Sequence, residues 1–139
     1  MTEGILVEVA RHWREARVES GGRQVRVQPG AIGGHVNRML APYHARIGPD
    51  PASINACMMG GILANNSSGM CCGVEQNAYH TLRSLTFVLP SGTVIDTAQF
   101  DAGEQFRSRE PALAEGLLQI RAEVLSSPGL CERIRMKYR

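Results

Sequence analysis

Residues 60–73, which read GGILANNSSGMCCG, constrain the fold more than any other stretch of this sequence. Adjacent pairs of glycine, asparagine, serine and cysteine occur there, and the apolar residues show neither the alternation of a strand nor the stripe of a helix. Clusters of Gly, Asn and Ser are typical of turns. We therefore expect a loop, which is either a tight structural connection or a binding loop whose backbone N–H groups point at a ligand.

The N-terminal part of the chain has the pattern of short strands. GILVEV at 4–9 reads as a strand, and two further runs follow at 16–20 and 24–30. Gly21-Gly22 separates these two runs, and a glycine pair between alternating segments predicts a β-hairpin. The chain therefore begins with short strands that we expect to be antiparallel.

Two helices are expected in the middle of the chain. Apolar residues at helical spacing predict a helix over 33–41, and a proline follows that run directly. Ser53 is a suitable N-cap for a short helix over INACMM at 54–59, which the glycine pair of 60–73 would end or bend.

The last part of the chain contains a second hairpin and a long helix. LRSLTFVL at 82–89 and TVIDT at 93–97 read as two strands joined by a Pro-Ser-Gly turn, and Pro111 opens a helix that stops near residue 126. The apolar stripe of this helix consists of Leu113, Leu117, Ile120 and Val124.

Strands and helices are thus mixed without a regular βαβ alternation, which favours an α+β fold over a doubly wound one. The length of 139 residues suits a single domain with a hydrophobic core of its own. Its expected parts are short strands at 1–30, a helix with polar loops at 31–81, a β-hairpin at 82–97 and C-terminal helices at 108–139.

Composition excludes several classes of partner. The net charge of +2 is too small and too dispersed to suggest a nucleic-acid partner, and no apolar run approaches the roughly 20 residues that span a bilayer. The N-terminus does not read as a secretory signal. Irregularly spaced cysteines then suggest reduced thiols in the cytoplasm. These cysteines are Cys57, Cys71, Cys72 and Cys131.

A second candidate binding loop is GPDPAS at 48–53. Its prolines stiffen the backbone, so that the polar groups of Asp50 and Ser53 would be held ready for a ligand. A rigid connection without a ligand is the simpler interpretation. The functional one gains weight because the two polar loops lie about ten residues apart in the sequence.

No constellation of catalytic or metal-binding residues stands out. Cys71 and Cys72 lack the spacing of metal ligands, and half-buried structural thiols are the expected interpretation. The histidines are scattered, and His80 alone follows a polar loop closely. We therefore assign no catalytic residue and no metal ligand from the sequence.

Four segments together carry a resemblance to a known family. They are VRVQPG at 25–30, RIGPDPAS at 46–53, GGILANNSSGM at 60–70 and LTFVLPSGTVIDT at 85–97. In this order and spacing they resemble the FAD-binding domain of FAD-linked oxidases of the vanillyl-alcohol oxidase or p-cresol methylhydroxylase type. The chain is most similar to the subgroup of D-lactate, glycolate and D-2-hydroxyglutarate dehydrogenases.

The resemblance implies an α+β domain whose two loops lie along the flavin and its diphosphate. Small side chains would admit the ring, while backbone amides and Asn or Ser groups would meet its polar atoms. The cofactor-binding residues that the resemblance implies are Pro49, Asp50, Pro51, Ala52, Ser53, Asn55, Ala56, Gly60, Gly61, Ala64, Asn65, Asn66, Ser68 and Gly69.

The sequence also departs from the family. A Gly-rich pyrophosphate loop resembling GxGTSLxG, the later Gly-Ser-Glu-Gly-Thr-Leu segment and the substrate-binding cap domain are missing from it. We therefore expect a fragment of an FAD-dependent 2-hydroxy-acid oxidoreductase that is inactive alone. Its partners would be FAD and the remainder of a parent chain, including an iron–sulfur region, and the parent would be cytoplasmic or membrane-peripheral.

Two other interpretations remain open. The chain could be a non-catalytic folded module that carries no flavin and self-associates, for example as a homodimer, through surface that normally meets missing parts. A phosphate- or nucleotide-binding protein unrelated to flavin would rest on the Gly/Asn/Ser loop alone.

Overall fold

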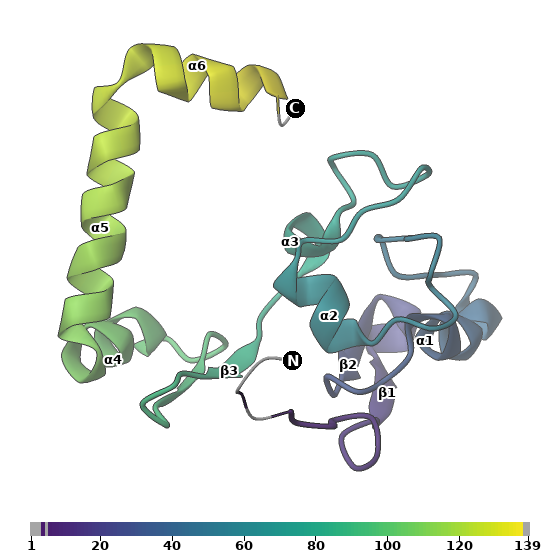
Figure 1. Ribbon diagram of the computed structural model, residues 1–139. Coiled ribbons are helices and arrows are strands. Elements are labelled where there is room, and N and C mark those ends of the chain that lie inside the picture. Colours follow the sequence, from purple (N-terminus) through teal and green to yellow (C-terminus); the bar gives the residue numbers. More distant parts are fainter. Residues whose placement is uncertain (1–3, 5, 138–139) are drawn as a thin grey trace. The chain divides into compact units, whose positions relative to one another are not determined.

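A computed structural model describes residue 4 and residues 6–137 of the chain. Contacts divide the chain into two compact units, Met1–Thr81 (unit 1) and Leu82–Arg139 (unit 2) (Figure 1). This boundary falls inside the single domain that we expect from the sequence. Each unit combines helices with a two-stranded antiparallel sheet, as an α+β chain should.

The sheet of unit 1 is a hairpin of β1 (Ala16–Glu19) and β2 (Gln24–Val27). The register pairs Val18 with Val25, and the connecting 3₁₀ turn η1 (Ser20–Gly22) has positive φ at each of its residues. Glycine tolerates this backbone without strain, which is why a glycine pair marks the turn. The structure confirms the hairpin predicted at this place.

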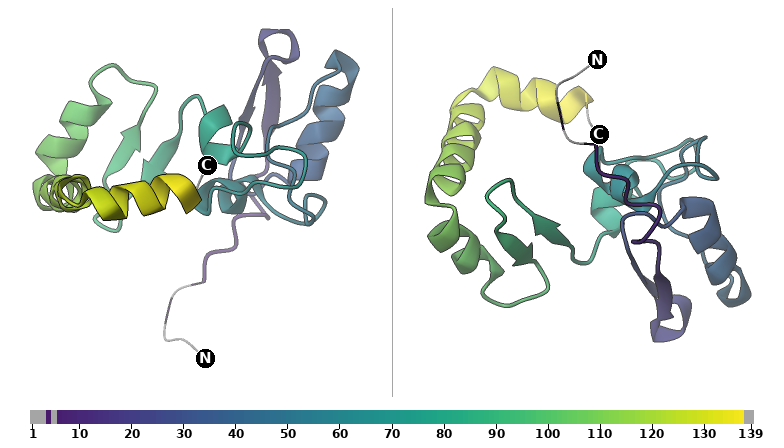
Figure 2. Two further views of the ribbon diagram at one scale, coloured as in Figure 1. Left: turned by 90° about the horizontal axis from the view of Figure 1, so that it is seen from above. Right: turned by 60° about the horizontal axis from the view of Figure 1, so that its bottom comes forward.

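The helices of unit 1 close a small hydrophobic core. They are α1 (Gly33–Leu40), α2 (Met59–Ala64) and α3 (Ala78–Thr81), with the 3₁₀ turn η2 (Ala41–Tyr43) following α1. The hairpin lies beside α1 (Figure 2), and its valines pack partly against the core. The core residues are Ala31, Val36, Leu40, Met59, Ile62 and Ala78.

The helix predicted over 33–41 is confirmed, but the one predicted over 54–59 is wrong. Met58 is extended and pairs with Ile32 in an isolated antiparallel bridge, so the next helix cannot begin before residue 59. Residues 52–56 form turns instead, and the backbone carbonyl of Ser53 accepts hydrogen bonds from the N–H groups of Ala56 and Cys57 (2.7 and 2.8 Å).

The strand predicted at 4–9 is also wrong over its described residues. Residues 6–9 belong to no strand, and Ile5 lies outside the described residues. The chain turns directly afterwards, where the N–H of Trp13 donates to the carbonyl of Val9 (2.9 Å). An apolar run becomes a strand only where a neighbouring strand exchanges backbone hydrogen bonds with it, and the described residues supply no such neighbour here.

Unit 2 begins with the second predicted hairpin. β3 (Thr86–Val88) pairs with β4 (Val94–Asp96), with Phe87 opposite Ile95. The hydroxyl of Ser91 in the turn donates to the carboxylate of Glu110, and this bond, with a second from Thr93, holds the pKa of Glu110 below its usual range. The carboxylate thereby connects the hairpin to the helical region.

Three helices follow: α4 (Ala102–Arg109), α5 (Pro111–Ser126) and α6 (Pro128–Lys137). The long helix from Pro111 is confirmed, whereas α4 was not predicted. The apolar stripe expected on α5 is mostly exposed, with Leu117 exposed to 52% and Ile120 to 59%. Within the described residues, no helix is long and apolar enough to cross a membrane.

Candidate functional site

The structure brings together the two polar loops that the sequence singles out. We call residues 48–53 the first loop and residues 65–77 the second loop. The N–H of Cys71 in the second loop donates to Oδ2 of Asp50 in the first (3.3 Å). Gly69 lies so close to Asp50 that a Cβ added there would collide with its side chain and backbone. Two segments that are separate in sequence therefore form one surface.

A second contact joins the same loops at Gly48. A Cβ at this position would collide with the backbone carbonyl of Gln76 and come within 2.7 Å of Cγ2 of Thr81. The close approach requires glycine, because any larger residue would separate the backbones. The first loop therefore contacts the second loop at two places, near Gly69 and Cys71 and again at Gln76.

Part of the predicted binding loop is helical. Gly60, Gly61 and Ala64 lie in α2, so the expectation of a loop from residue 60 onward is wrong. The N–H groups of Met59 and Gly60 donate to the carbonyls of Ala31 and Pro29 (both 2.8 Å), which fixes the start of the helix. Such long-range partners cannot be read from local composition.

The asparagine pair has a structural role in part. Asn66 has a positive φ of 51°, and its Oδ1 accepts a hydrogen bond from the N–H of Tyr79 in the first turn of α3 (2.9 Å). Oδ1 of Asn65 accepts from the hydroxyl of Ser67 (2.5 Å). Asn66 therefore caps a helix, whereas Asn65 and Ser68 are exposed.

Two runs of backbone donors in the second loop are unused, and Cys71 separates them. Within residues 6–137, the N–H groups of Ser68, Gly69 and Met70 donate to no other group of the chain, and neither do those of residues 72–75. The hydroxyl of Ser68 is also without a partner there, and Met70 is 99% exposed. Adjacent free amides on one short segment can donate to carbonyl or phosphate oxygens of a ligand.

The remaining residues that the resemblance implies as flavin contacts lie in the first loop and in the turn that follows it. Pro49 is buried and Pro51 half-buried, while the other four residues are exposed: Ala52, Ser53, Asn55 and Ala56. The carbonyls of Ile54 and Cys57 accept hydrogen bonds from the N–H groups of Gly34 (2.7 Å) and Gly33 (3.1 Å). These N-terminal amides of α1 are therefore already occupied by the chain itself.

The thiol of Cys72 and the ring of His80 contact backbone carbonyls of the second loop. Cys71 is exposed and Cys72 buried, with its Sγ 3.2 Å from the carbonyl of Gly73. The ring Nδ1 of His80 lies 2.6 Å from the carbonyl of Val74. Within the described part of the chain, no group of three or more His, Cys, Asp or Glu residues could hold a metal ion.

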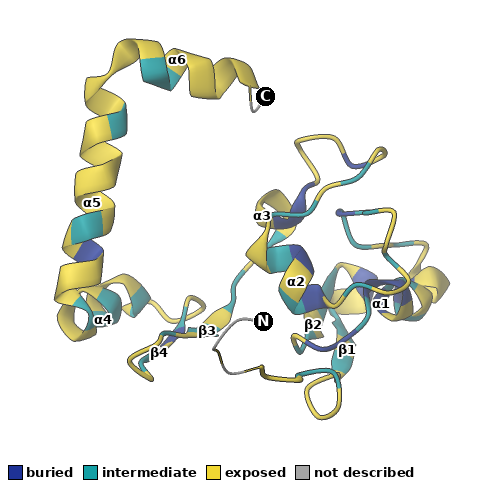
Figure 3. Ribbon diagram, viewed as in Figure 1, coloured by how far each residue is buried: buried dark blue, intermediate teal, exposed yellow. Residues whose placement is uncertain are grey.

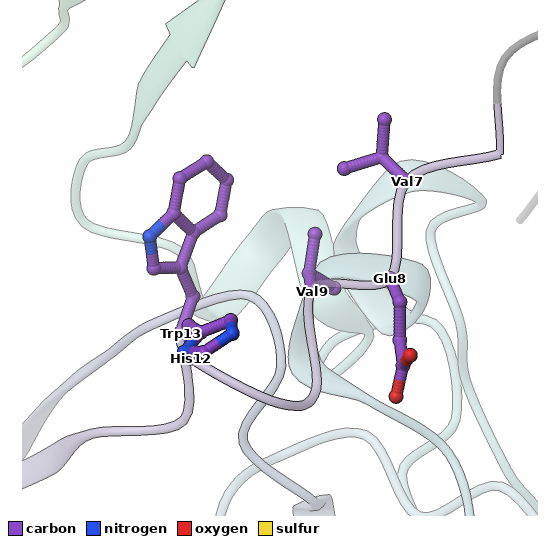
Figure 4. A pocket seen from close by; sticks show the side chains of 5 residues that line it. All are labelled: Val7, Glu8, Val9, His12 and Trp13. Atoms are coloured by element: carbon purple, nitrogen blue, oxygen red, sulfur yellow. The ribbon is translucent and has the colours of Figure 1, made fainter.

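A separate hollow lies near the N-terminus. It has a volume of about 300 Å³, and Figure 4 shows the side chains of Val7, Val9 and Trp13 around it together with Glu8 and His12. None of the residues that the resemblance implies as flavin contacts lines it. Its lining is mostly apolar, in contrast to the polar surface of the two loops.

Comparison with known proteins relates this chain to flavin-binding proteins. Residues 1–98 match the family model described as the FAD binding domain. Glycolate oxidase subunit GlcD of Escherichia coli is 28% identical over 131 residues, which cover 89% of this chain and 25% of that protein. The D-2-hydroxyglutarate dehydrogenase of Pantoea ananatis is 28% identical over 120 residues, covering 86% of the chain and 11% of that protein. No solved structure matches the chain with significance.

Proposed function

The chain belongs to the FAD binding domain family, and from this premise we propose that its first and second loops contact the flavin of an FAD-dependent oxidoreductase acting on a 2-hydroxy acid. The hydroxy-acid substrate is supported by the names of its relatives, a glycolate oxidase subunit and two D-2-hydroxyglutarate dehydrogenases. The chain spans about a quarter of the length of the first relative and about a tenth of the others. Substrate oxidation is therefore proposed for the whole protein.

The free N–H groups at Ser68, Gly69 and Met70 are the observation that carries the proposal. A flavin ring has two carbonyl oxygens, and its side arm carries hydroxyls and phosphates, so it offers the acceptors that these donors lack. Glycine at position 69 lets a flat ring approach the backbone closely. The residues present thus fit the group that the family binds.

The carboxylate of Asp50 makes the second loop a better site for the flavin ring than for the diphosphate of the cofactor. Its carboxylate lies against Gly69, directly beside the free amides. A negative charge at this distance disfavours the diphosphate and leaves the uncharged ring as the better occupant of the second loop. We therefore assign the amides of residues 68–70 to the isoalloxazine ring.

The residues of this chain bind and orient the cofactor. When bound, the flavin would supply the hydride-accepting chemistry that oxidation of a hydroxyl-bearing carbon requires. The amides of the second loop hold the ring by its polar edge, and the exposed side chains of Asn65 and Ser68 add donors at the same edge. We assign no proton transfer to these residues.

Titration with cofactor fragments tests the proposal. We expect FAD and riboflavin to lose fluorescence on adding the full chain, with weak binding that saturates at about millimolar concentration. ADP should compete poorly, because it lacks the ring. The purified chain should be colourless or faintly yellow and without dehydrogenase activity. Equal competition by ADP, or no response to either flavin, would contradict the proposal.

A pair of serine substitutions makes this test site-specific. Ser68→Ala removes an exposed hydroxyl beside the free amides, and we expect riboflavin affinity to fall about three- to tenfold, the value of one hydrogen bond. Ser108→Ala is the matched control in α4, where the hydroxyl donates to the carbonyl of Gln105 (3.1 Å). It should leave the affinity unchanged.

A further inference from the structure

We propose that Asp50 is a positioning residue, whose carboxylate fastens the second loop in place and does not contact the flavin itself. This inference rests on the proposed function, and it revises the role that the sequence suggests for Asp50. Its Oδ2 accepts the hydrogen bond from the N–H of Cys71, and its other oxygen lies against Gly69. The carboxylate therefore touches the second loop on both sides of Met70.

The second oxygen of the carboxylate is closed off from any ligand. Oδ1 of Asp50 is buried and has no hydrogen-bond partner among the described residues. A cofactor cannot reach this atom while Gly69 covers it. An unpartnered buried oxygen is unfavourable, so the hold on the second loop is assigned to the other oxygen, Oδ2, which accepts from Cys71.

The segment that carries the free amides depends on this carboxylate. The ends of the second loop are anchored: the N–H of Ser67 donates to the carbonyl of Ile62 (2.9 Å), and the N–H of Ala78, directly after the loop, donates to the carbonyl of Ser67 (3.0 Å). Between these anchors, Asp50 accepts the hydrogen bond that ties residues 68–71 to the first loop. Removing that acceptor should free the flavin-facing amides.

The thiol of Cys72 reports whether the loop is closed. Cys72 is 6% exposed, and its Sγ lies 3.5 Å from the carbonyl of Gly69, so it is covered by the same segment. Lifting the segment would expose it to an alkylating reagent. Cys71 is already exposed, and Cys71→Ser keeps the backbone N–H that Asp50 accepts, so this substitution gives a suitable background.

The experiment measures alkylation of Cys72 by iodoacetamide in the full chain, located by fragment-ion mass spectrometry. We expect Asp50→Ala to raise the rate about tenfold or more, because a hydrogen bond to a charged acceptor is lost. Asp50→Asn should stay within about threefold, since its amide oxygen still accepts from Cys71. Asp96→Ala is the matched control: Oδ1 of Asp96 likewise accepts one backbone N–H, from Ala98 (2.9 Å).

A second variant reaches the same state without changing Asp50. Gly69→Ala would drive a Cβ into the carboxylate, so it should expose Cys72 as Asp50→Ala does. Gly116→Ala is its control, because nothing lies within 4 Å of that position. Far-UV circular dichroism shows whether each variant remains folded. If Gly69→Ala does not fold, the comparison of Asp50→Ala with Asp50→Asn still tests the proposal.

Riboflavin titration of the same variants completes the test. We expect the affinity to fall about tenfold in Asp50→Ala and to be restored in Asp50→Asn. If the alkylation rate of Cys72 were unchanged in Asp50→Ala and Gly69→Ala, the claim that Asp50 holds the second loop would be wrong, regardless of the riboflavin affinities. Exposed Cys72 with full riboflavin affinity would overturn the positioning role. Absence of flavin binding by the unsubstituted chain would overturn the proposed function, and the alkylation rates would still decide whether Asp50 holds the loop.

Discussion

The two compact units differ in how far their residues are buried (Figure 3). Unit 1 buries Val36 to 0% and Ile62 to 1% exposure inside a contiguous core. In unit 2, Ile95 and Ala114 are buried, while Leu117 and Leu118 on α5 are more than half exposed. Similar hydrophobic residues thus stabilise one unit and lie at the surface of the other.

The difference shows that helical periodicity does not by itself produce a core. Helix α5 has the more extended apolar pattern, yet it buries only Ala114 among its described residues, whereas the short helix α2 buries Met59 and Ile62 in the core of unit 1. Burying apolar surface contributes about 25 cal/mol per Å², but only where a second surface covers it. In unit 1 the loops and the hairpin provide that second surface. Stability should therefore be concentrated in unit 1.

The largest expected effect is that of truncating the core of unit 1. Ile62→Ala should lower the free energy of unfolding by about 2–5 kcal/mol, because the site is fully buried. Ile120→Ala on α5, exposed to 59%, should change it by less than about 0.5 kcal/mol. Urea denaturation followed by circular dichroism measures both. Equal effects would show that α5 is covered in solution.

The same glycine substitution should have opposite signs in the two units. A Cβ at Gly30 would lie 2.6 Å from the carbonyl oxygens of Val9 and Trp13, so Gly30→Ala should destabilise unit 1 by about 1–3 kcal/mol. Gly116 in α5 has open space around it, and Gly116→Ala should stabilise the helix by about 0.5–1 kcal/mol. Thermal unfolding of the two variants would contradict this comparison if both shifts had the same sign.

Hydrogen exchange sharpens the comparison without any substitution. Amides in α1, which pack on the core, should exchange at least about tenfold more slowly than those in α5, since local opening needs less free energy where few apolar contacts are lost. Mass spectrometry of peptic peptides after deuterium labelling measures this. Uniform protection along the chain would mean that the two units unfold as one.

The smallest expected effect concerns pH and unit 2. The pKa of Glu110 is lowered by the hydrogen bonds from Ser91 and Thr93, so its stabilising contribution is present above the unfolded pKa and is lost as pH falls through the folded pKa. Ser91→Ala should lower the melting temperature slightly at neutral pH and not at acidic pH. Ser126→Ala, whose hydroxyl donates to the carbonyl of Glu123 (2.9 Å), is the control and should show no such dependence.

Local signals in the sequence were enough for several elements of the fold. The pair Gly21-Gly22 supplies the positive φ values of the first hairpin turn, and Pro111 stands at the first position of α5, where its missing N–H is harmless. Both features act within a few residues. For this reason their elements could be predicted without knowledge of the tertiary structure.

Elements fixed by distant partners could not be predicted in the same way. The start of α2 depends on the bridge between Ile32 and Met58, and the N–H of Tyr79 in α3 donates to Asn66, thirteen residues earlier, while Asn77 caps the helix locally by accepting from His80. At the candidate site, composition indicated two polar loops, but it could not show that Asp50 joins them. That contact exists only because the folded backbone brings Cys71 to the carboxylate.

The adjacent glycines of α2 have different consequences for mutational tolerance. Gly60 is confined, since a Cβ would lie 2.8 Å from that of Pro29, whereas Gly61 is exposed with nothing within 4 Å. In a saturation library selected for folding alone, position 60 should reject most side chains and position 61 should accept many. If a second selection for flavin binding removed the variants at position 61, that glycine would be identified as one retained for its ligand and not for the fold.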